Sequence, residues 1–155
     1  MTGNTKLQDI KDLEMWLPHV LSGLKAQMPR VFLGGTCNNS TWRDDIIPYL
    51  ANYFNPVVGD WNQEAQDNEI RERQQCDFCL YAITPKMHGT YSIAEVVDDS
   101  NKRPSKTILV LLAGDGLSEF TLAQWKSLVQ VSKMVEANGG TVFTSLYEAA
   151  EYINN

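Results

Sequence analysis

The segment Ser92-x-x-Glu95 carries a carboxylate whose position could support covalent chemistry. Near the start of a helix, the helix dipole keeps a carboxylate ionised, which is worth about 0.3–1 kcal/mol. An ionised carboxylate at the mouth of a sheet crevice can act as a nucleophile or stabilise a cationic transition state. The same spacing fits a capping box, in which Glu95 bonds back to the helix start, and taken alone it favours that cap.

Two glycine-containing segments could line a ligand site. Gly34, Gly35 and Thr36 follow an apolar run. A backbone without Cβ atoms lets a sugar or phosphate approach, although a tight turn explains the glycines equally well. They match neither the dinucleotide-binding nor the P-loop glycine motif. Farther along, His88 precedes Gly89; this histidine could donate to a leaving group or a phosphate, or lie on the surface without such a role.

Asp60 and Trp61 form a third candidate pair. An aspartate could hold sugar hydroxyls and a tryptophan could stack on a base, and the alternative is a turn aspartate beside a tryptophan at the core edge. Most of the polar residues that follow are expected to form a solvated helix face, namely Asp67, Asn68, Glu69, Arg71 and Glu72. Asp98 and Asp99 receive the same interpretation.

Cys76-x-x-Cys79 resembles a redox or zinc pair. A redox pair follows a strand, however, whereas Cys79 falls inside an apolar run. A structural zinc site needs four ligands, and only Cys37, His19 and His88 remain in the chain. Buried thiols are therefore expected, and no metal site.

Apolar periodicity predicts the elements that position these residues. Helices are expected over 8–27, where Pro18 predicts a kink or two short pieces, and over 41–54, 62–75, 91–101, 119–137 and 146–153. A C-cap at Asn138-Gly139-Gly140 and an N-cap at Ser145 accompany the last two. Strands are expected over 30–36, 55–58, 77–84, 107–113 and 141–144.

This alternation predicts an α/β fold with a five-stranded parallel doubly wound sheet, flavodoxin- or Rossmann-like, in strand order 2-1-3-4-5, preceded by an extra N-terminal helix. Ligands bind such sheets outside the carboxyl ends of the strands, where the strand order reverses between strands 1 and 3. The loops at 34–41 and 84–95 end those two strands. The polar segments thus converge where the topology predicts a site.

The bulk composition excludes several classes of protein. The 155 residues are 43% hydrophobic and carry a formal net charge of -6, which disfavours a nucleic-acid polymer as partner. No run of 18 apolar residues predicts a membrane span, and the first residues lack the apolar core of a signal peptide. The three cysteines are an odd number, so no disulfide framework is expected. We therefore expect a cytoplasmic protein with no membrane partner.

Three segments resemble the nucleoside 2-deoxyribosyltransferase-like family: VFLGGTCNNSTWRDDIIPYL, NPVVGDWN and CDFCLYAITPKMHGTYSIAEVVDDSN. The resemblance implies a domain over 30–155 after a helical extension over 1–29, in one domain overall. It implies that Glu95 attacks C1′ of a nucleoside, which changes our interpretation of Glu95 from cap to catalytic residue. Glu69, eight residues before Asp77, matches a base-contacting aspartate of the family.

The remaining expectations follow from the same resemblance. Gly34, Gly35 and Thr36 would shape the sugar pocket, Asp60 and Trp61 would contact sugar or base, and Tyr91 and Ser92 would position Glu95. The partner would be a small nucleoside or nucleotide, with no cofactor, and the assembly a homodimer or larger homo-oligomer. The alternatives are a nucleoside 5′-monophosphate N-glycosidase, with Ser40, Thr41 and Arg43 reading the phosphate, and a non-catalytic nucleotide sensor.

Overall fold

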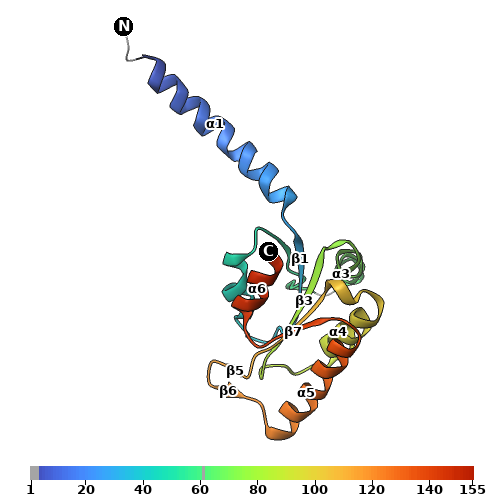
Figure 1. Ribbon diagram of the computed structural model, residues 1–155. Helices are drawn as coiled ribbons and strands as arrows, with labels where there is room; N and C mark the ends of the chain where they lie inside the picture. Colours follow the sequence, from blue (N-terminus) through green and yellow to red (C-terminus); the bar gives the residue numbers. More distant parts are fainter. Residues whose placement is uncertain (1–3, 61) are drawn as a thin grey trace.

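Strands and helices alternate along the chain (Figure 1). The computed structural model describes residues 4–60 and 62–155. Its helices are α1 (Asn4–Gln27), α2 (Trp42–Ile46), α3 (Gln63–Gln75), α4 (Tyr91–Lys102), α5 (Leu122–Ala137) and α6 (Leu146–Asn154), with 3-10 turns η1 (Ile47–Tyr49) and η2 (Pro104–Lys106). Its strands are β1 (Arg30–Gly35), β2 (Asn52–Phe54), β3 (Phe78–Ile83), β4 (Thr107–Leu111), β5 (Gly114–Asp115), β6 (Ser118–Glu119) and β7 (Thr141–Phe143).

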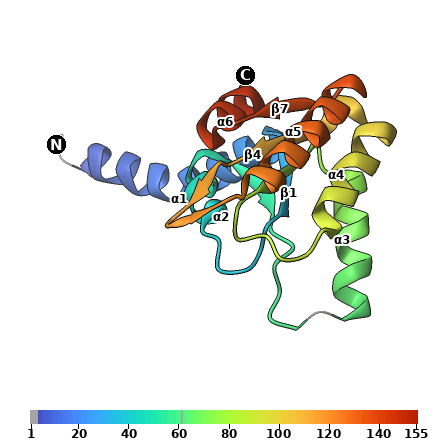
Figure 2. The ribbon, with the colours of Figure 1, turned by 90° about the horizontal axis from the view of Figure 1, so that it is seen from below.

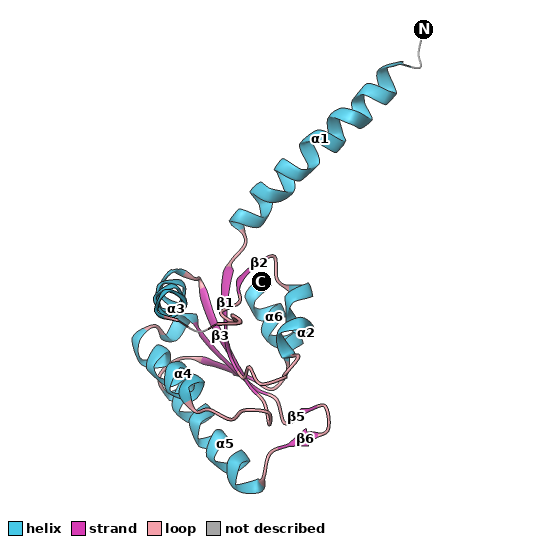
Figure 3. Ribbon diagram, turned by 180° about the vertical axis from the view of Figure 1, so that it is seen from behind, coloured by secondary structure: helices cyan, strands magenta, loops and turns pink. Residues whose placement is uncertain are grey.

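The main sheet has the strand order β2-β1-β3-β4-β7, and all of its pairings are parallel. β1 is the point of reversal, since Val31 pairs with Tyr53 of β2 on one side and with Phe78 of β3 on the other. Helices α2 and α6 lie on one side of the sheet, and α3, α4 and α5 lie on the other (Figure 3). The predicted doubly wound, flavodoxin-like fold is therefore confirmed.

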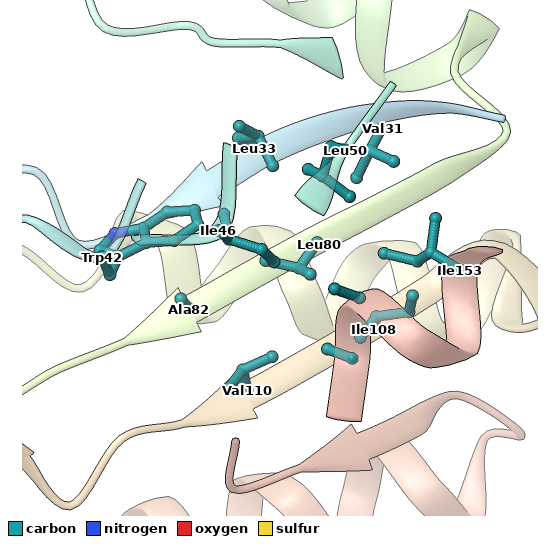
Figure 4. Close-up of a cluster of buried hydrophobic side chains, with 12 residues drawn as sticks. Val31, Leu33, Trp42, Ile46, Leu50, Leu80, Ala82, Ile108, Val110 and Ile153 are labelled. Carbon is teal, nitrogen blue, oxygen red and sulfur yellow. The ribbon is translucent and has the colours of Figure 1, made fainter. Parts of the chain in front are cut away.

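Alternate residues of the central strands point to opposite sides of this sheet. Leu33, Leu80 and Val110 pack with Trp42 of α2 and Ile153 of α6 in one cluster of buried side chains (Figure 4). Phe32, Tyr81 and Leu109 belong to a second cluster, together with Val96 of α4 and Leu128 of α5. Because both sides are covered, β1, β3 and β4 are buried along almost their whole length.

The expected helix over 41–54 and strand over 55–58 are wrong. Helix α2 ends at Ile46, and the 3-10 turn that contains Pro48 follows it directly. The second strand begins earlier, at Asn52, and residues 55–58 form a loop. Both differences have the same cause: Pro48 and Pro56 lack the N–H that a helix interior or a sheet ladder requires.

Of the two alternatives predicted at Pro18, a kink or two short pieces, the second is wrong, since α1 runs unbroken from Asn4 to Gln27. Residues 15–28 are exposed, so water can satisfy the hydrogen bond that Pro18 cannot make. The predicted C-cap after α5 is confirmed, and of the capping box predicted between Ser145 and Glu148 the N-cap half is confirmed. Gly139 after α5 has φ +96, and Ser145 accepts from the Glu148 N–H at the start of α6. Within residues 4–60 and 62–155, no helix is both long and apolar enough to cross a bilayer.

The hairpin β5–β6 was not predicted from the sequence, which indicated a strand to residue 113 and a helix from 119. Gly116 takes φ +63 at its turn, a conformation that favours glycine. Asp115 of the hairpin accepts from Ser40 after β1 and forms an ion pair with Lys86 after β3, at 2.9 Å. The hairpin therefore ties together the two loops at the carboxyl ends of β1 and β3.

Candidate active site

Two glycines end β1 because β3 lies too close for a side chain. A Cβ on Gly35, which has φ +113, would lie 2.2 Å from the Ala82 carbonyl oxygen. A Cβ on Gly34 would lie 2.6 Å from the Tyr81 ring. The backbone of β1 thus reaches the site without side chains, and both glycines line a cleft there.

Thr36 and Arg43 hold the loop after β1. The Thr36 hydroxyl accepts from the Thr84 N–H at 3.0 Å, which joins the ends of β1 and β3. The Arg43 guanidinium donates to the carbonyl oxygens of Leu33, at 3.0 and 3.2 Å, and of Thr36, at 2.8 Å. Because the Arg43 side chain is buried and its N–H groups bind backbone oxygens, Arg43 stabilises the loop. This role disfavours Arg43 as a residue that binds a substrate phosphate.

The cleft lies at the carboxyl ends of β1 and β3 and has a volume of about 230 Å³. A second hollow of about 200 Å³ shares Gly35, Cys37, Tyr91 and Ser92 with it. Their combined volume lies within the roughly 300–1,000 Å³ of small-molecule sites. The cleft is lined by Gly34, Gly35, Cys37, Arg43, Pro56, Val57, Val58, Glu69, Tyr91, Ser92 and Glu95.

Glu95 does not cap its helix. Helix α4 begins at Tyr91 after Thr90, which places Glu95 in the second turn, and its side chain is only 5% exposed. Its Oε1 atom accepts from the Arg73 guanidinium of α3 at 3.0 Å. The capping-box interpretation is therefore wrong, and Glu95 lines the cleft instead.

The sequence predicted that the start of the helix keeps Glu95 ionised. In the structure, burial has the larger effect on the pKa of Glu95 and favours the protonated form. The pKa of Glu95 is raised to about 8: burial is the largest cause, the charge of Glu69 and a hydrogen bond between the two carboxyls add to it, and the charge of Arg73 opposes it. Burial also raises the pKa of Glu69. Two interacting carboxyls lose their protons as a pair, so Glu69 and Glu95 can share one proton inside the cleft.

Arg73 belongs to a buried ionic network that the sequence analysis did not find. Asp99, fully buried, accepts from Arg73 at 2.7 Å, from Arg103 at 2.6 Å and from the Tyr81 hydroxyl. Burial alone would raise the pKa of Asp99, but these hydrogen bonds lower it on balance. The solvated-face interpretation is wrong for Asp99, and for Glu69 and Glu72, which are each 9% exposed.

A helical spacing was the missed signal. Glu69, Glu72, Arg73 and Cys76 recur at three- and four-residue intervals, which places them on one side of α3. In a helix with so few apolar residues, that side faces the sheet. Long-range ion pairs satisfy its charges, since Arg73 pairs with α4 and Glu72 pairs with Arg30 at 2.9 Å.

The other expected site residues divide into three groups. Tyr91 and Ser92 line both hollows, whereas Thr36, His88 and Gly89 line the second one. Asp60 lines a separate surface depression beside Asn62 and Arg71. Trp61 lies outside the described residues. The structure thus brings eight of the expected residues to the cleft and the adjoining hollow besides Glu95: Gly34, Gly35, Thr36, Glu69, His88, Gly89, Tyr91 and Ser92.

Cys76 and Cys79 are buried thiols, as the sequence predicted. Cys76 and Cys79 are free and fully buried. Burial raises the pKa of the Cys76 thiol to about 11 and that of Cys79 to about 12. Thiols this far from ionisation are poor nucleophiles and metal ligands, so both act as small apolar side chains.

An open parallel sheet with a carboxylate-lined cleft at its switch point defines a class of small-ligand α/β proteins. The model of the family described as nucleoside 2-deoxyribosyltransferase like matches residues 28–115. This span is more than half of the chain and contains every residue that lines the cleft. The chain therefore belongs to that family. None of the curated proteins matches it.

Proposed function

We propose that the protein cleaves or transfers at the N-glycosidic bond of a nucleoside or nucleotide, with Glu95 as the nucleophile. The observation that carries the proposal is a buried carboxylate at the switch-point cleft, held by an arginine, in a chain of this family. The ligand is a small molecule, which the size of the two adjoining hollows supports.

In the first step, a Glu95 carboxylate oxygen forms a bond to C1′ of the sugar while the bond from C1′ to the base nitrogen breaks. The electron pair of that bond leaves with the base. The sugar passes through an oxocarbenium-like state, which the adjacent carboxylate stabilises, as in retaining glycosidases. In the second step, water or another base attacks C1′ and gives its proton to the Glu69 carboxylate, and the ester bond breaks to regenerate the Glu95 carboxylate.

Arg73 holds the nucleophile in place and favours its charged form. Its guanidinium binds the Oε1 atom of Glu95 and is itself fixed by Asp99. Burial raises the pKa of Glu95, and the positive charge of Arg73 opposes that rise. The ionised fraction of Glu95, and with it the rate of attack, therefore depends on Arg73.

Glu69 acts as the general acid that assists the departure of the base. Its pKa is raised by burial, so it retains a proton more readily than an exposed glutamate, and it lines the same cleft as Glu95. A protonated carboxyl beside the leaving base can donate its proton to the base nitrogen as the bond breaks. Gly34 and Gly35 would leave room for the sugar, and Tyr91 and Ser92, at the start of α4, would fix the direction of Glu95.

The test is chromatography of free bases after incubation with 2′-deoxynucleosides and their 5′-monophosphates, with and without a second base. Base release without an acceptor identifies a hydrolase, and product that forms only with an acceptor identifies a transferase. A requirement for the 5′-phosphate identifies a nucleotide N-glycosidase. Glu95→Gln, which preserves the size of the side chain, is the control. No reaction with any substrate at high enzyme concentration would contradict the proposal and favour a nucleotide-binding module.

A further inference from the structure

Helix α1 extends away from the sheet and its covering helices, as Figure 1 and Figure 2 show. Two residues, Met28 and Pro29, connect it to β1. From residue 15 onward its side chains are exposed, large apolar ones included. The exposed fractions are 52–65% for Met15, Trp16, Leu17, Val20, Leu21 and Leu24, and 37% for Met28.

The apolar residues of α1 follow the spacing of a coiled coil. Intervals of three and four residues alternate through Ile10, Leu13, Leu17, Val20 and Leu24. Such 3.5-residue periodicity keeps one seam of side chains facing a partner helix. We call these five positions the α1 seam. Trp16 and Leu21 flank the seam, whereas Met15 and Ser22 occupy the outward position of the same repeat.

A helix in this position requires a partner. Isolated helices are marginal in water, and most helical stability in proteins comes from the packing of an apolar side. Burying an aliphatic side chain is worth about 1.5–3 kcal/mol at about 25 cal/mol per Å², which corresponds to roughly 60–120 Å² each. The seam and flanking side chains between Trp16 and Met28 therefore offer roughly 400–700 Å², close to the about 800 Å² per partner of a stable interface.

Charge favours another copy of this chain as the partner. The helix contains three lysines (Lys6, Lys11, Lys25) and three acidic residues (Asp9, Asp12, Glu14), so it has no net charge. A helix that lies on anionic lipid has a polar side rich in Lys and Arg, which α1 lacks. A neutral helix meets no net repulsion from its own copy, whereas the chain as a whole has a charge of -6.

We propose that α1 associates with α1 of a second copy through the α1 seam, so that the protein is an oligomer held by its N-terminal helix. Pro18 fits this arrangement, because it follows Leu17 and points outward in the repeat, where water can take the missing hydrogen bond. The matched family span begins at residue 28, so this contact lies outside the segment that forms the cleft.

The test is the mass of the full chain in sedimentation equilibrium at micromolar concentration. The wild-type chain is expected at twice the 17.5 kDa of one copy or more. The double variant Leu17→Glu, Leu24→Glu places charges in the seam and is expected at 17.5 kDa. The matched variant Met15→Glu, Ser22→Glu adds the same charges at outward positions and should keep the wild-type mass.

Three results would overturn the proposal. A monomeric wild-type chain would mean that another kind of partner covers α1. A seam variant with the wild-type mass would place the association elsewhere on the molecule. Equal dissociation of both variants would show that added charge matters and position does not. Near-ultraviolet circular dichroism checks that each variant retains the packed sheet, which lies apart from α1 (Figure 1).

Discussion

The two sides of the central sheet are built differently from the same strands. On the side under α2 and α6, the core cluster consists of apolar side chains such as Leu80 and Ile108. On the side under α3 and α4, Tyr81, the next residue along β3, hydrogen-bonds to a buried aspartate. We call these the apolar side and the charged side. The charged side has the buried ionic residues Arg73, Glu95 and Asp99.

The apolar side mainly stabilises the fold, whereas the charged side holds the residues that could do chemistry. Side chains on the apolar side gain free energy by leaving water, at about 25 cal/mol per Å². Buried ions lose hydration and stabilise the fold only while each charge keeps its partners. The charged side therefore contributes less to folding than its buried volume suggests, and in return it holds a glutamate with a raised pKa in a cleft. Residues of this kind are typical of functional sites.

The largest expected effect comes from breaking the network on the charged side. Asp99→Asn removes the charge that faces Arg73 and Arg103, both of which stay positive. Loss of one partner of a buried pair costs about 3–5 kcal/mol, to be measured by urea unfolding. The matched variant is Asp98→Asn, because Asp98 is 47% exposed, pairs with Lys102 on the surface and reaches Arg73 only at 4.0 Å; it should cost no more than about 1 kcal/mol. Equal losses for both would contradict the comparison.

A cavity on the apolar side should lower the stability of the protein without changing its turnover rate. Ile108→Ala removes a side chain that is 1% exposed on central strand β4, and its expected cost is about 2–5 kcal/mol. Because Ile108 points away from the cleft, the folded variant should turn over substrate at the wild-type rate. The measurements are urea unfolding and kcat at a temperature where both proteins are folded. A fall in kcat would show that the two sides are coupled.

Arg73→Gln tests the electrostatics of the charged side. Removing the positive charge raises the pKa of Glu95 further, so the ionised nucleophile forms only at higher pH. Turnover should rise with pH through about 8 in the wild-type protein and at still higher pH in the variant. Each unit of upward shift lowers turnover at pH 7 about tenfold. Arg73→Lys keeps the charge and should restore the wild-type profile, whereas a merely structural Arg73 would leave the profile in place.

The last expected effect is a gain in stability for Glu95→Gln. The folded pKa of Glu95, about 8, lies above its usual value near 4.5, so the native state binds the extra proton between these pH values. Glu95 thus favours folding below about pH 4.5, and this contribution is lost as the pH rises through about 8. At pH 9 the glutamine variant should unfold with a free energy higher by roughly 2–5 kcal/mol, because each unit of pKa shift corresponds to more than about 1 kcal/mol. Thermal unfolding at pH 5 and pH 9 measures the difference, and a variant less stable at pH 9 would contradict it.

Most of the fold could be predicted from local pattern. The apolar runs of β1, β3 and β4 and the strand–helix alternation determine the sheet order, and the site followed from that order. The edge strand β2 was placed too late because Val57 and Val58 are β-branched and apolar, as in a strand. In the structure these valines line the cleft and are half exposed. Apolar residues that line a ligand site can therefore give the same sequence pattern as a buried strand.

The supporting network of the site could not be predicted in the same way. Arg73 meets Glu95 and Asp99 across 22 and 26 residues, and no local spacing encodes those pairs. A charged residue on a polar helix predicts solvent exposure unless its distant partners are known. The local motif of Glu95 favoured a helix cap, so Glu95 became the catalytic candidate only through the family resemblance, and Glu69 likewise because it matches a family position. The environment that raises the pKa of both belongs to the tertiary structure.

The measurement that tests the central claim most directly is mass spectrometry of the protein quenched during turnover of a nucleoside. Wild-type protein should gain the mass of one sugar residue, and proteolysis should locate it on the peptide that contains Glu95. Glu95→Gln should remain unmodified under the same conditions. Base release without any sugar adduct would contradict attack by Glu95, and so would an adduct that persists in the Glu95→Gln variant.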